Sequence, residues 1–180
     1  WSVRKADSIL REKPAVLTEK WDYDTGLILK GFEQIGLETK DRKYLDYVKR
    51  TIDGIVQPDG TIRGYRLEEY NIDMINMGKV IFHLLAQSTD PKDKERYTKA
   101  LQHLRSQMRT HPRTKERAFW HKKIYPNQMW LDGVFMASPF LAEYAVVFQE
   151  PALFDDVANQ ILLAEKYMRD PKTGLLYHGW

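Results

Sequence analysis

The sequence predicts an all-α fold built from stacked helical hairpins, and three observations support this. A unit of two helices and a turn recurs three times along the 180 residues. Apolar side chains recur at helical spacing in both helices of each copy. Turn-forming residues follow the second helix each time. Because such hairpins bury their apolar faces by stacking on their neighbours, the repeat predicts one continuous helical architecture.

The first helix of each copy follows an aromatic and polar segment that ends in aspartate: WDYD (21–24), YNID (70–73) and MWLD (129–132). These aspartates, Asp24, Asp73 and Asp132, lie 49 and 59 positions apart (24 to 73 and 73 to 132). Aspartate is a favoured N-cap residue, because its carboxylate accepts the unpaired amide hydrogens of a first helical turn. The helices that follow carry the apolar residues Leu27, Ile28, Phe32 and Ile35; Val80, Ile81, Leu84 and Leu85; and Val134, Phe135, Phe140, Leu141 and Tyr144.

The second helices, expected over residues 41–56, 94–109 and 151–169, are more amphipathic. A narrow apolar stripe indicates one buried face. The predicted stripes are Tyr44, Leu45, Val48, Ile52 and Ile55; Tyr97, Leu101, Leu104 and Met108; and Leu153, Val157, Ile161 and Leu162. The turns QPDG, HPRTKE and DPKTG then end these helices.

Hairpins of this kind can form an open solenoid or close into a toroid. Solenoid repeats are usually shorter and more regular, at about 34 to 47 residues. The long, irregular repeats with aromatic ends favour a toroid of which about half the ring is present. A half ring would expose an apolar flank, so we expect residues 1–180 to be a fragment.

Composition excludes several functional classes. There is no cysteine, which excludes a disulfide framework and a cysteine nucleophile and is compatible with the bacterial cytoplasm or periplasm. Basic and acidic residues are interspersed and the net charge is only +3, so we expect no nucleic-acid partner. No apolar run is long enough to predict a membrane span. Phosphate-loop, dinucleotide, nucleophile-elbow and metal-binding histidine motifs are missing as well, which predicts no metal and no cofactor.

The segments YNIDMINMGK, FWHKKIYPNQMWLDGVFM and LLYHGW resemble glycoside hydrolase family 105, the unsaturated rhamnogalacturonyl hydrolases, which are related to the unsaturated glucuronyl hydrolases of family 88. The resemblance extends from Trp21 to Trp180. It implies an (α/α)6 toroid, with residues 1–180 as the N-terminal portion of a single catalytic domain. The implied substrate is an oligosaccharide with a 4,5-unsaturated galacturonic acid at its non-reducing end, linked to rhamnose. The implied reaction is hydration of the vinyl ether in that sugar, which requires no cofactor.

The resemblance also implies which residues form the site. Asp132, in MWLDG, would be the acid and base, because its position between Trp130 and Phe135 favours the protonated carboxyl group. Asp73, in YNID, would be the second catalytic carboxylate and would orient the sugar. Tyr23, Trp130, His121 and His178 would bind the substrate, with Trp130 stacking on a sugar face.

Other interpretations of these residues remain. Asp73 and Asp132 could be plain helix caps, as we expect for Asp24, and the histidines could be structural. Lys122 and Lys123 could attract the uronate, although a solvated loop is the simpler interpretation. The alternative function is a non-catalytic helical-repeat module that binds carbohydrate or protein. The sequence does not indicate an oligomeric state.

Overall fold

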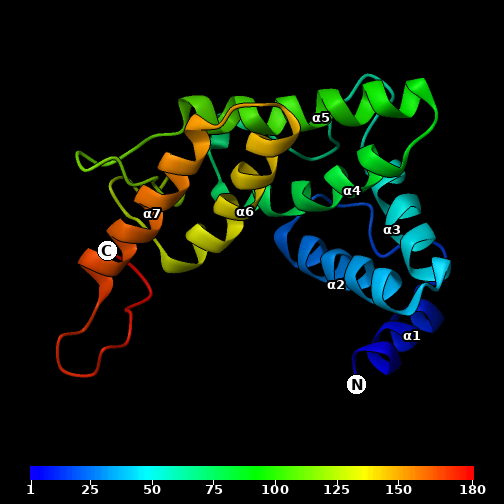
Figure 1. Cartoon of the computed structure of the whole chain (residues 1–180), viewed down its shortest axis with the longest axis horizontal. Coiled ribbons are helices and arrows are strands. Elements are labelled where there is room, and N and C mark those ends of the chain that lie inside the picture. Colours follow the sequence, from blue (N-terminus) through cyan, green and yellow to red (C-terminus); the bar gives the residue numbers. More distant parts are fainter. The chain divides into compact units, whose positions relative to one another are not determined.

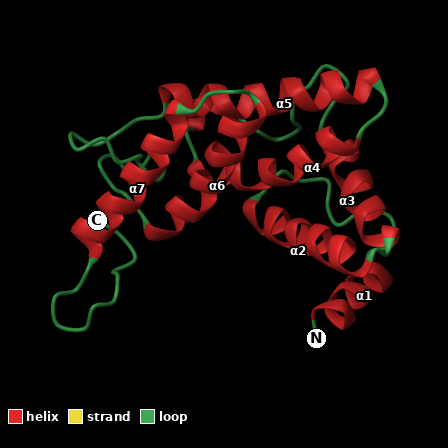
Figure 2. Ribbon diagram, in the orientation of Figure 1, coloured by secondary structure: helices red, strands yellow, loops and turns green.

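A computed structural model describes all residues, 1–180, and its regular elements are all helices (Figures 1 and 2). The seven α-helices are α1 (Ser2–Glu12), α2 (Tyr23–Thr39), α3 (Arg42–Ile55), α4 (Lys79–Gln87), α5 (Pro91–Thr110), α6 (Leu131–Val147) and α7 (Ala152–Met168). Two 3-10 helices, η1 (Leu67–Glu69) and η2 (Ile72–Gly78), precede α4. No helix is both long enough and apolar enough to span a lipid bilayer.

The three predicted turns have the same backbone feature. An isolated antiparallel bridge closes each one, and the bridges join Val56 to Ile62, Arg113 to Phe119 and Arg169 to Leu176. Each bridge begins within a few residues of the end of α3, α5 or α7. The repeat of helix, turn and closing segment that the sequence predicts is therefore present in the backbone.

The chain forms two compact units. The first contains Trp1–Tyr65 and Met77–His103, and the second contains Arg66–Asn76 and Leu104–Trp180. The two 3-10 helices and α5 lie at the boundaries, so η2 and α5 contribute residues to both units.

In the first unit, α2 packs against α1, α3 and α4. Phe32 of α2 stacks on Tyr47 of α3 with ring centroids 5.2 Å apart. The two helices approach closely at Gly36, where a Cβ atom would lie 2.7 Å from Cγ of Leu45. The predicted face of α3 is confirmed, since Tyr44, Val48, Ile52 and Ile55 are fully or almost fully buried.

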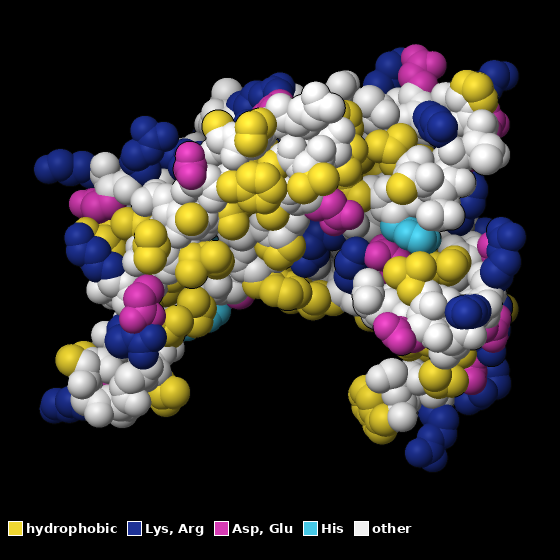
Figure 3. Space-filling model, viewed as in Figure 1, with side chains coloured by type: hydrophobic (Ala, Val, Ile, Leu, Met, Phe, Trp, Pro, Cys, Tyr) yellow, Lys and Arg dark blue, Asp and Glu magenta, His cyan; other side chains and the backbone are white.

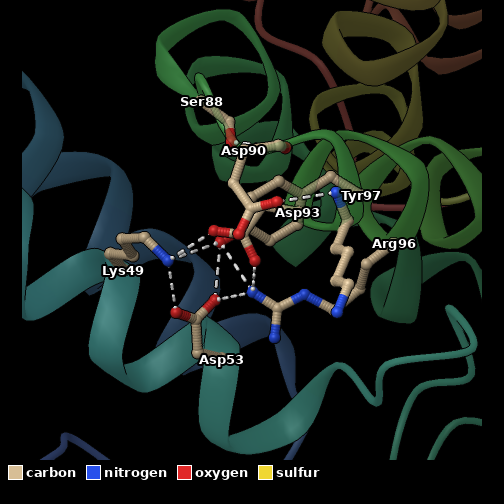
Figure 4. A network of polar contacts seen from close by, with 8 residues as sticks. Lys49, Asp53, Ser88, Asp90, Asp93, Arg96 and Tyr97 are labelled. Carbon is tan, nitrogen blue, oxygen red and sulfur yellow. Dashed lines mark hydrogen bonds and ion pairs between the residues drawn. The ribbon is translucent and has the colours of Figure 1, made fainter.

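A network of charged side chains also lies within the first unit (Figure 4). Lys49 and Asp53 of α3 form ion pairs with Arg96 and Asp93 of α5 at 2.6 to 3.0 Å. The Tyr97 hydroxyl donates to Asp53 at 2.6 Å, and burial together with this carboxylate raises the pKa of Tyr97 to about 12. Because two cations face two carboxylates, the network joins α3 to α5 without an unpaired charge.

In the second unit, α6 packs against α7, but the buried face of α7 differs from the prediction. Ile161 and Leu162 are 52% and 65% exposed, whereas Leu163 and Ala164 are buried. Gln160 explains the difference. Its buried side chain accepts from the amide of Phe119 and donates to the carbonyl of Arg117 and to Asp156, which fixes the face that turns inward.

The predicted apolar helices are only partly buried. Leu27 and Ile28 of α2 and Phe135 of α6 are exposed. Because apolar residues surround α6 on all sides, packing against α7 covers only one of them. Hydrophobic side chains are accordingly visible on the surface over α6 and α7 (Figure 3).

The predicted caps are also different. Asp22, rather than Asp24, is the N-cap of α2, and its carboxylate accepts from the Thr25 amide at 2.8 Å. The N-cap of α6 is Trp130, and Asp132 lies inside the first turn. Asp73 lies in the first turn of η2, with five residues between it and the start of α4 at Lys79. Neither Asp73 nor Asp132 therefore caps an α-helix.

Candidate active site

Short backbone pairings, rather than helices alone, position the candidate residues of the second unit. Asn71 forms an antiparallel bridge with Lys122, and the amide of Ile72 donates to the carbonyl of His121 at 3.0 Å. The amide of His121 in turn donates to the carbonyl of Gln128 at 2.7 Å. These bonds place Asp73, the next residue after Ile72, beside His121 and Lys122.

A second pairing brings the C-terminal segment to the start of α6. Met129 and Trp180 exchange two backbone hydrogen bonds of 2.7 and 2.8 Å, and the amide of Leu131 donates to the carbonyl of His178 at 2.7 Å. His178 is consequently near Asp132, with its Nε2 3.8 Å from Oδ1 of the carboxyl group.

The two predicted catalytic aspartates converge. One side-chain ligand atom from each of Asp73, His121 and Asp132 lies within 4.8 Å of the others. Asp73 and His121 are buried, with 6% and 2% of their surface exposed. The cap interpretation gives no reason for two carboxyl groups to come this close, because like charges repel at such distances.

Asp73 is held as a carboxylate by two partners. Its Oδ2 lies 2.9 Å from Nζ of Lys122, and its Oδ1 lies 3.2 Å from Nε2 of His121, a contact whose angles fall short of a hydrogen bond. Burial raises the pKa of Asp73, but the interactions with His121 and Lys122 outweigh burial and leave the pKa below its usual value. Lys122 therefore has a partner in the site, and its interpretation as a solvated loop charge is wrong.

Asp132 is in a different environment. Its Oδ1 is shielded from solvent and has no hydrogen-bond partner, while the side chain as a whole is 39% exposed. No basic side chain lies at ion-pair distance apart from the exposed His178 at 3.8 Å. A carboxyl group with this exposure can reach a ligand, whereas both oxygens of Asp73 are engaged by neighbouring side chains.

Trp130 is surrounded by other rings. It stacks on His121 with centroids 4.2 Å apart and planes 9° apart, and on Tyr125 at 5.1 Å and 16°. His178 lies beside it at 5.3 Å with a tilt of 54°. Its indole N–H donates to Gln128 at 3.1 Å. The ring thus covers His121, and a sugar would have to use what remains of the indole surface.

Tyr23 belongs to the first unit, where it begins α2 and is 39% exposed. The geometry of the second unit does not include it, so its contact with substrate stays a prediction. The substrate roles of Trp130, His121 and His178 likewise stay predictions, although all three lie beside the aspartates.

Buried hydrogen bonds of Gln107 and His111 join the segments that carry Asp73 and His121. Gln107 donates to the carbonyl of Asn71 at 3.0 Å and lies 3.3 Å from Nδ1 of His111. The other nitrogen of His111 lies 2.7 Å from the carbonyl of Trp120, so it carries the hydrogen of a neutral ring. Burial lowers the pKa of His111 to about 4. A neutral His111 thus connects α5 to both segments that hold Asp73 and His121.

Asp73, His121 and Asp132 could also hold a divalent cation, since three protein ligands are the usual number at a catalytic zinc ion. Lys122 opposes this arrangement. Its ammonium group already neutralises Asp73 at 2.9 Å and would repel a cation bound at the same carboxylate. The donor set therefore suits acid–base chemistry better than metal binding.

Sequence reasoning missed Tyr125 and Gln128, which contact Trp130, and undervalued Lys122. The segment KKIYPNQ between His121 and Met129 contained the only signal for them, because its polar and aromatic residues fill a loop between two candidate site residues.

Comparisons with known proteins agree with this fold. The chain is 24% identical over 165 residues to the unsaturated rhamnogalacturonyl hydrolase YesR of Bacillus subtilis (strain 168), covering 89% of this chain and 45% of that protein. A solved structure of a glycoside hydrolase from family 105 of C. acetobutylicum ATCC 824 is 48% identical, with a TM-score of 0.92 over all of this chain and 49% of that one. A possible family 105 member from Klebsiella pneumoniae, at 22% identity and a TM-score of 0.77 over 90% of this chain and 41% of that one, shares the fold.

The predicted all-α fold and the predicted resemblance to family 105 are confirmed by these similarities. The chain spans about half the length of the relatives it matches. The family model described as Glycosyl Hydrolase Family 88 matches residues 1–180. The chain therefore belongs to glycosyl hydrolase family 88.

Proposed function

We propose that this chain forms part of a glycoside hydrolase that removes a 4,5-unsaturated galacturonic acid from the non-reducing end of rhamnogalacturonan oligosaccharides. The observation that carries the proposal is the convergence of Asp73 and Asp132 with His121 within 4.8 Å. The similarity to YesR, an unsaturated rhamnogalacturonyl hydrolase, supports the substrate class. We further propose that residues 1–180 contribute the N-terminal portion of one catalytic domain.

The substrate contains a vinyl ether, in which the ring oxygen is conjugated to the double bond between carbons 4 and 5. A carboxyl group donates its proton to carbon 4, and the ring oxygen stabilises the positive charge that appears at carbon 5. The resulting carboxylate then takes a proton from water, whose oxygen bonds to carbon 5. The hemiketal opens and the neighbouring sugar leaves, so one water is consumed and the carboxyl group is regenerated.

Asp132 is the better candidate for this acid. Both oxygens of Asp73 have partners, and those partners hold its pKa below the usual value, so Asp73 has no proton to donate near neutral pH. Asp132 is more exposed, and no lysine or arginine lies at ion-pair distance from its carboxyl group.

The other residues then have distinct roles. Asp73, fixed by Lys122, accepts hydrogen bonds from sugar hydroxyls and orients the reacting ring. The exposed His178 binds the uronate or a hydroxyl group at the entrance. The proposal keeps Tyr23 and Trp130 as substrate contacts and requires no metal or organic cofactor.

The non-catalytic binding module is the weaker alternative. It predicts that the aspartates act only as helix caps, but neither caps an α-helix. It also gives no account of a buried carboxylate beside a second carboxyl group, an arrangement that costs stability and is typical of functional sites.

The test is the full-length protein with an unsaturated galacturonyl-rhamnose disaccharide, followed by loss of the absorbance of the double bond. Asp132→Asn should lower kcat by roughly 10²- to 10⁴-fold, the usual contribution of general acid–base catalysis. Asp24→Asn is a matched control, because Asp24 has the equivalent position in the repeat and is exposed in the first turn of α2. An Asp132→Asn enzyme with wild-type kcat contradicts the proposal.

A further inference from the structure

The imidazole of His121 has one side that no hydrogen bond explains. Its Nε2 faces Asp73 at 3.2 Å, whereas its Nδ1 is buried without a hydrogen-bond partner. Buried ring nitrogens usually have a partner, and His111 nearby has one at each nitrogen. The bare Nδ1 therefore needs a specific explanation.

Gly133 lies against this nitrogen. A Cβ atom at Gly133 would lie 3.0 Å from Nδ1 of His121 and 3.4 Å from Cγ2 of Ile72. The first turn of α6 at Gly133 thus lies beside Nδ1 and provides it with no hydrogen-bond partner. Gly133 lies in the first turn of α6, one residue after Asp132, so the same turn holds the acid and touches the histidine.

The rest of the His121 ring is enclosed by aromatic and apolar side chains. Trp130 stacks on the imidazole at 4.2 Å, and a cavity of about 10 Å³ beside the ring is lined largely by apolar residues, including Phe119 and Val134. The ring has 1% of its side-chain surface exposed. It is held in place by packing, and only its Nε2 edge faces a polar partner.

From this geometry we infer that Gly133 is a positioning residue that selects the tautomer of His121 with its hydrogen on Nε2. A hydrogen on Nδ1 would have no acceptor, because this buried nitrogen has no hydrogen-bond partner beside Gly133, and that is unfavourable for a buried donor. With the hydrogen on Nε2, the donor nitrogen lies 3.2 Å from Oδ1 of Asp73 and leaves Oδ2 to Lys122. Gly133 would thereby keep Asp73 in its orienting role, and this kinetic consequence rests on the proposed function.

Gly133→Ala is the direct test, because the new methyl group would press on Nδ1 and move the ring by a few tenths of an ångström away from it. Gly31→Ala is the matched control. Gly31 lies within α2, and a Cβ atom there would meet nothing within 4 Å. Both substitutions raise helix propensity to the same extent, so a difference between them reports the contact with His121.

The primary measurement is long-range ¹H–¹⁵N NMR of the full-length protein labelled at histidine, with His121 assigned from the signals lost in His121→Asn. We expect a protonated Nε2 and an unprotonated Nδ1 in the wild type and in Gly31→Ala, and displaced ¹⁵N signals of His121 in Gly133→Ala. We expect kcat of Gly133→Ala to fall by about 3- to 30-fold, with Gly31→Ala at the wild-type value. A hydrogen on Nδ1 in the wild type, or unchanged His121 signals and kcat in Gly133→Ala, would overturn the inference.

This design separates the inference from the proposed function. If the wild-type protein shows no activity on the unsaturated disaccharide, the proposed function fails, but the NMR signals still decide the tautomer. If activity is present and the tautomer is wrong, only the role of Gly133 fails.

Discussion

Replacing Lys122 with methionine tests the electrostatic design of the site. Methionine keeps much of the length and volume of the side chain but removes the ammonium group 2.9 Å from Oδ2 of Asp73. The gross attraction at 2.9 Å is about 6 kcal/mol at an effective dielectric constant of about 20. Desolvation offsets most of it, so the net contribution is that of a hydrogen bond between charged groups, about 1.5 to 3 kcal/mol.

Loss of this energy should make Asp73 bind its proton roughly ten- to a hundredfold more tightly. In the wild type the pKa of Asp73 lies below 3.8, so the ionised group stabilises the fold at neutral pH, and this stability is lost as the pH falls through the folded pKa. In Lys122→Met, only the interaction with His121 opposes the rise that burial causes in the pKa of Asp73. Lys122→Met should therefore be less stable than the wild type at neutral pH and should lose less stability on acidification, whereas the acid limb of kcat/KM should move to higher pH.

The assay is a ¹³C NMR titration of the aspartate carboxyl groups, together with urea unfolding from neutral pH to below the pKa that Asp73 has in the wild type. Lys123→Met is the matched control. Lys123 is the next residue after Lys122 and is exposed. Its ammonium group contacts only the carbonyl of Glu68, at 3.4 Å, and the face of the Tyr70 ring. If Asp73 titrates alike in wild type and Lys122→Met, or if Lys123→Met shifts it equally, the reasoning is refuted.

Two further predictions concern stability. The pKa of His111 falls from 6.5 to about 4 on folding, so the unfolded chain binds more protons between these values. The free energy of unfolding should accordingly decrease by about 3 kcal/mol as the pH falls from 6.5 to 4. His111→Gln should lack this decrease when unfolding by urea is measured at several pH values. Identical pH dependence in both proteins would argue against a neutral buried ring. Leu29→Ala in α2, at a fully buried position, should cost about 2 to 5 kcal/mol in the free energy of unfolding. Leu27→Ala, 41% exposed in the same helix, should cost much less, and equal losses would contradict the packing of α2.

The helices could be predicted from the sequence because their signal is local. The stripe of Tyr44, Val48, Ile52 and Ile55 repeats every three or four residues, and the structure buries all four side chains. The face of α7 could not be predicted in the same way, because apolar residues occur on more than one side of the helix. Hydrogen bonds from Gln160 to a distant loop decide between those sides, and no local pattern contains them.

The site shows the same division. Asp73 and Asp132 could be selected from their motifs and their place in the repeat, and the structure brings them together. Lys122 could not be assigned from the sequence, because its partner Asp73 lies in another segment and the two meet only through the pairing of Asn71 with Lys122. Gly133 is part of the motif MWLDG, but its contact with His121 depends on the rotation of α6 against a loop.

The backbone hydrogen bonds that position the site residues allow local opening of the site to be measured separately from unfolding of the whole protein. The amides of Ile72, His121 and Leu131 donate to carbonyl groups of other segments, so they exchange with deuterium only when those segments part. An opening confined to the pairing of Met129 with Trp180 would release the amide of Leu131 while the helices stay protected. Mass spectrometry after deuterium labelling can therefore follow local opening around Asp73, His121 and Asp132 under conditions in which the protein as a whole stays folded.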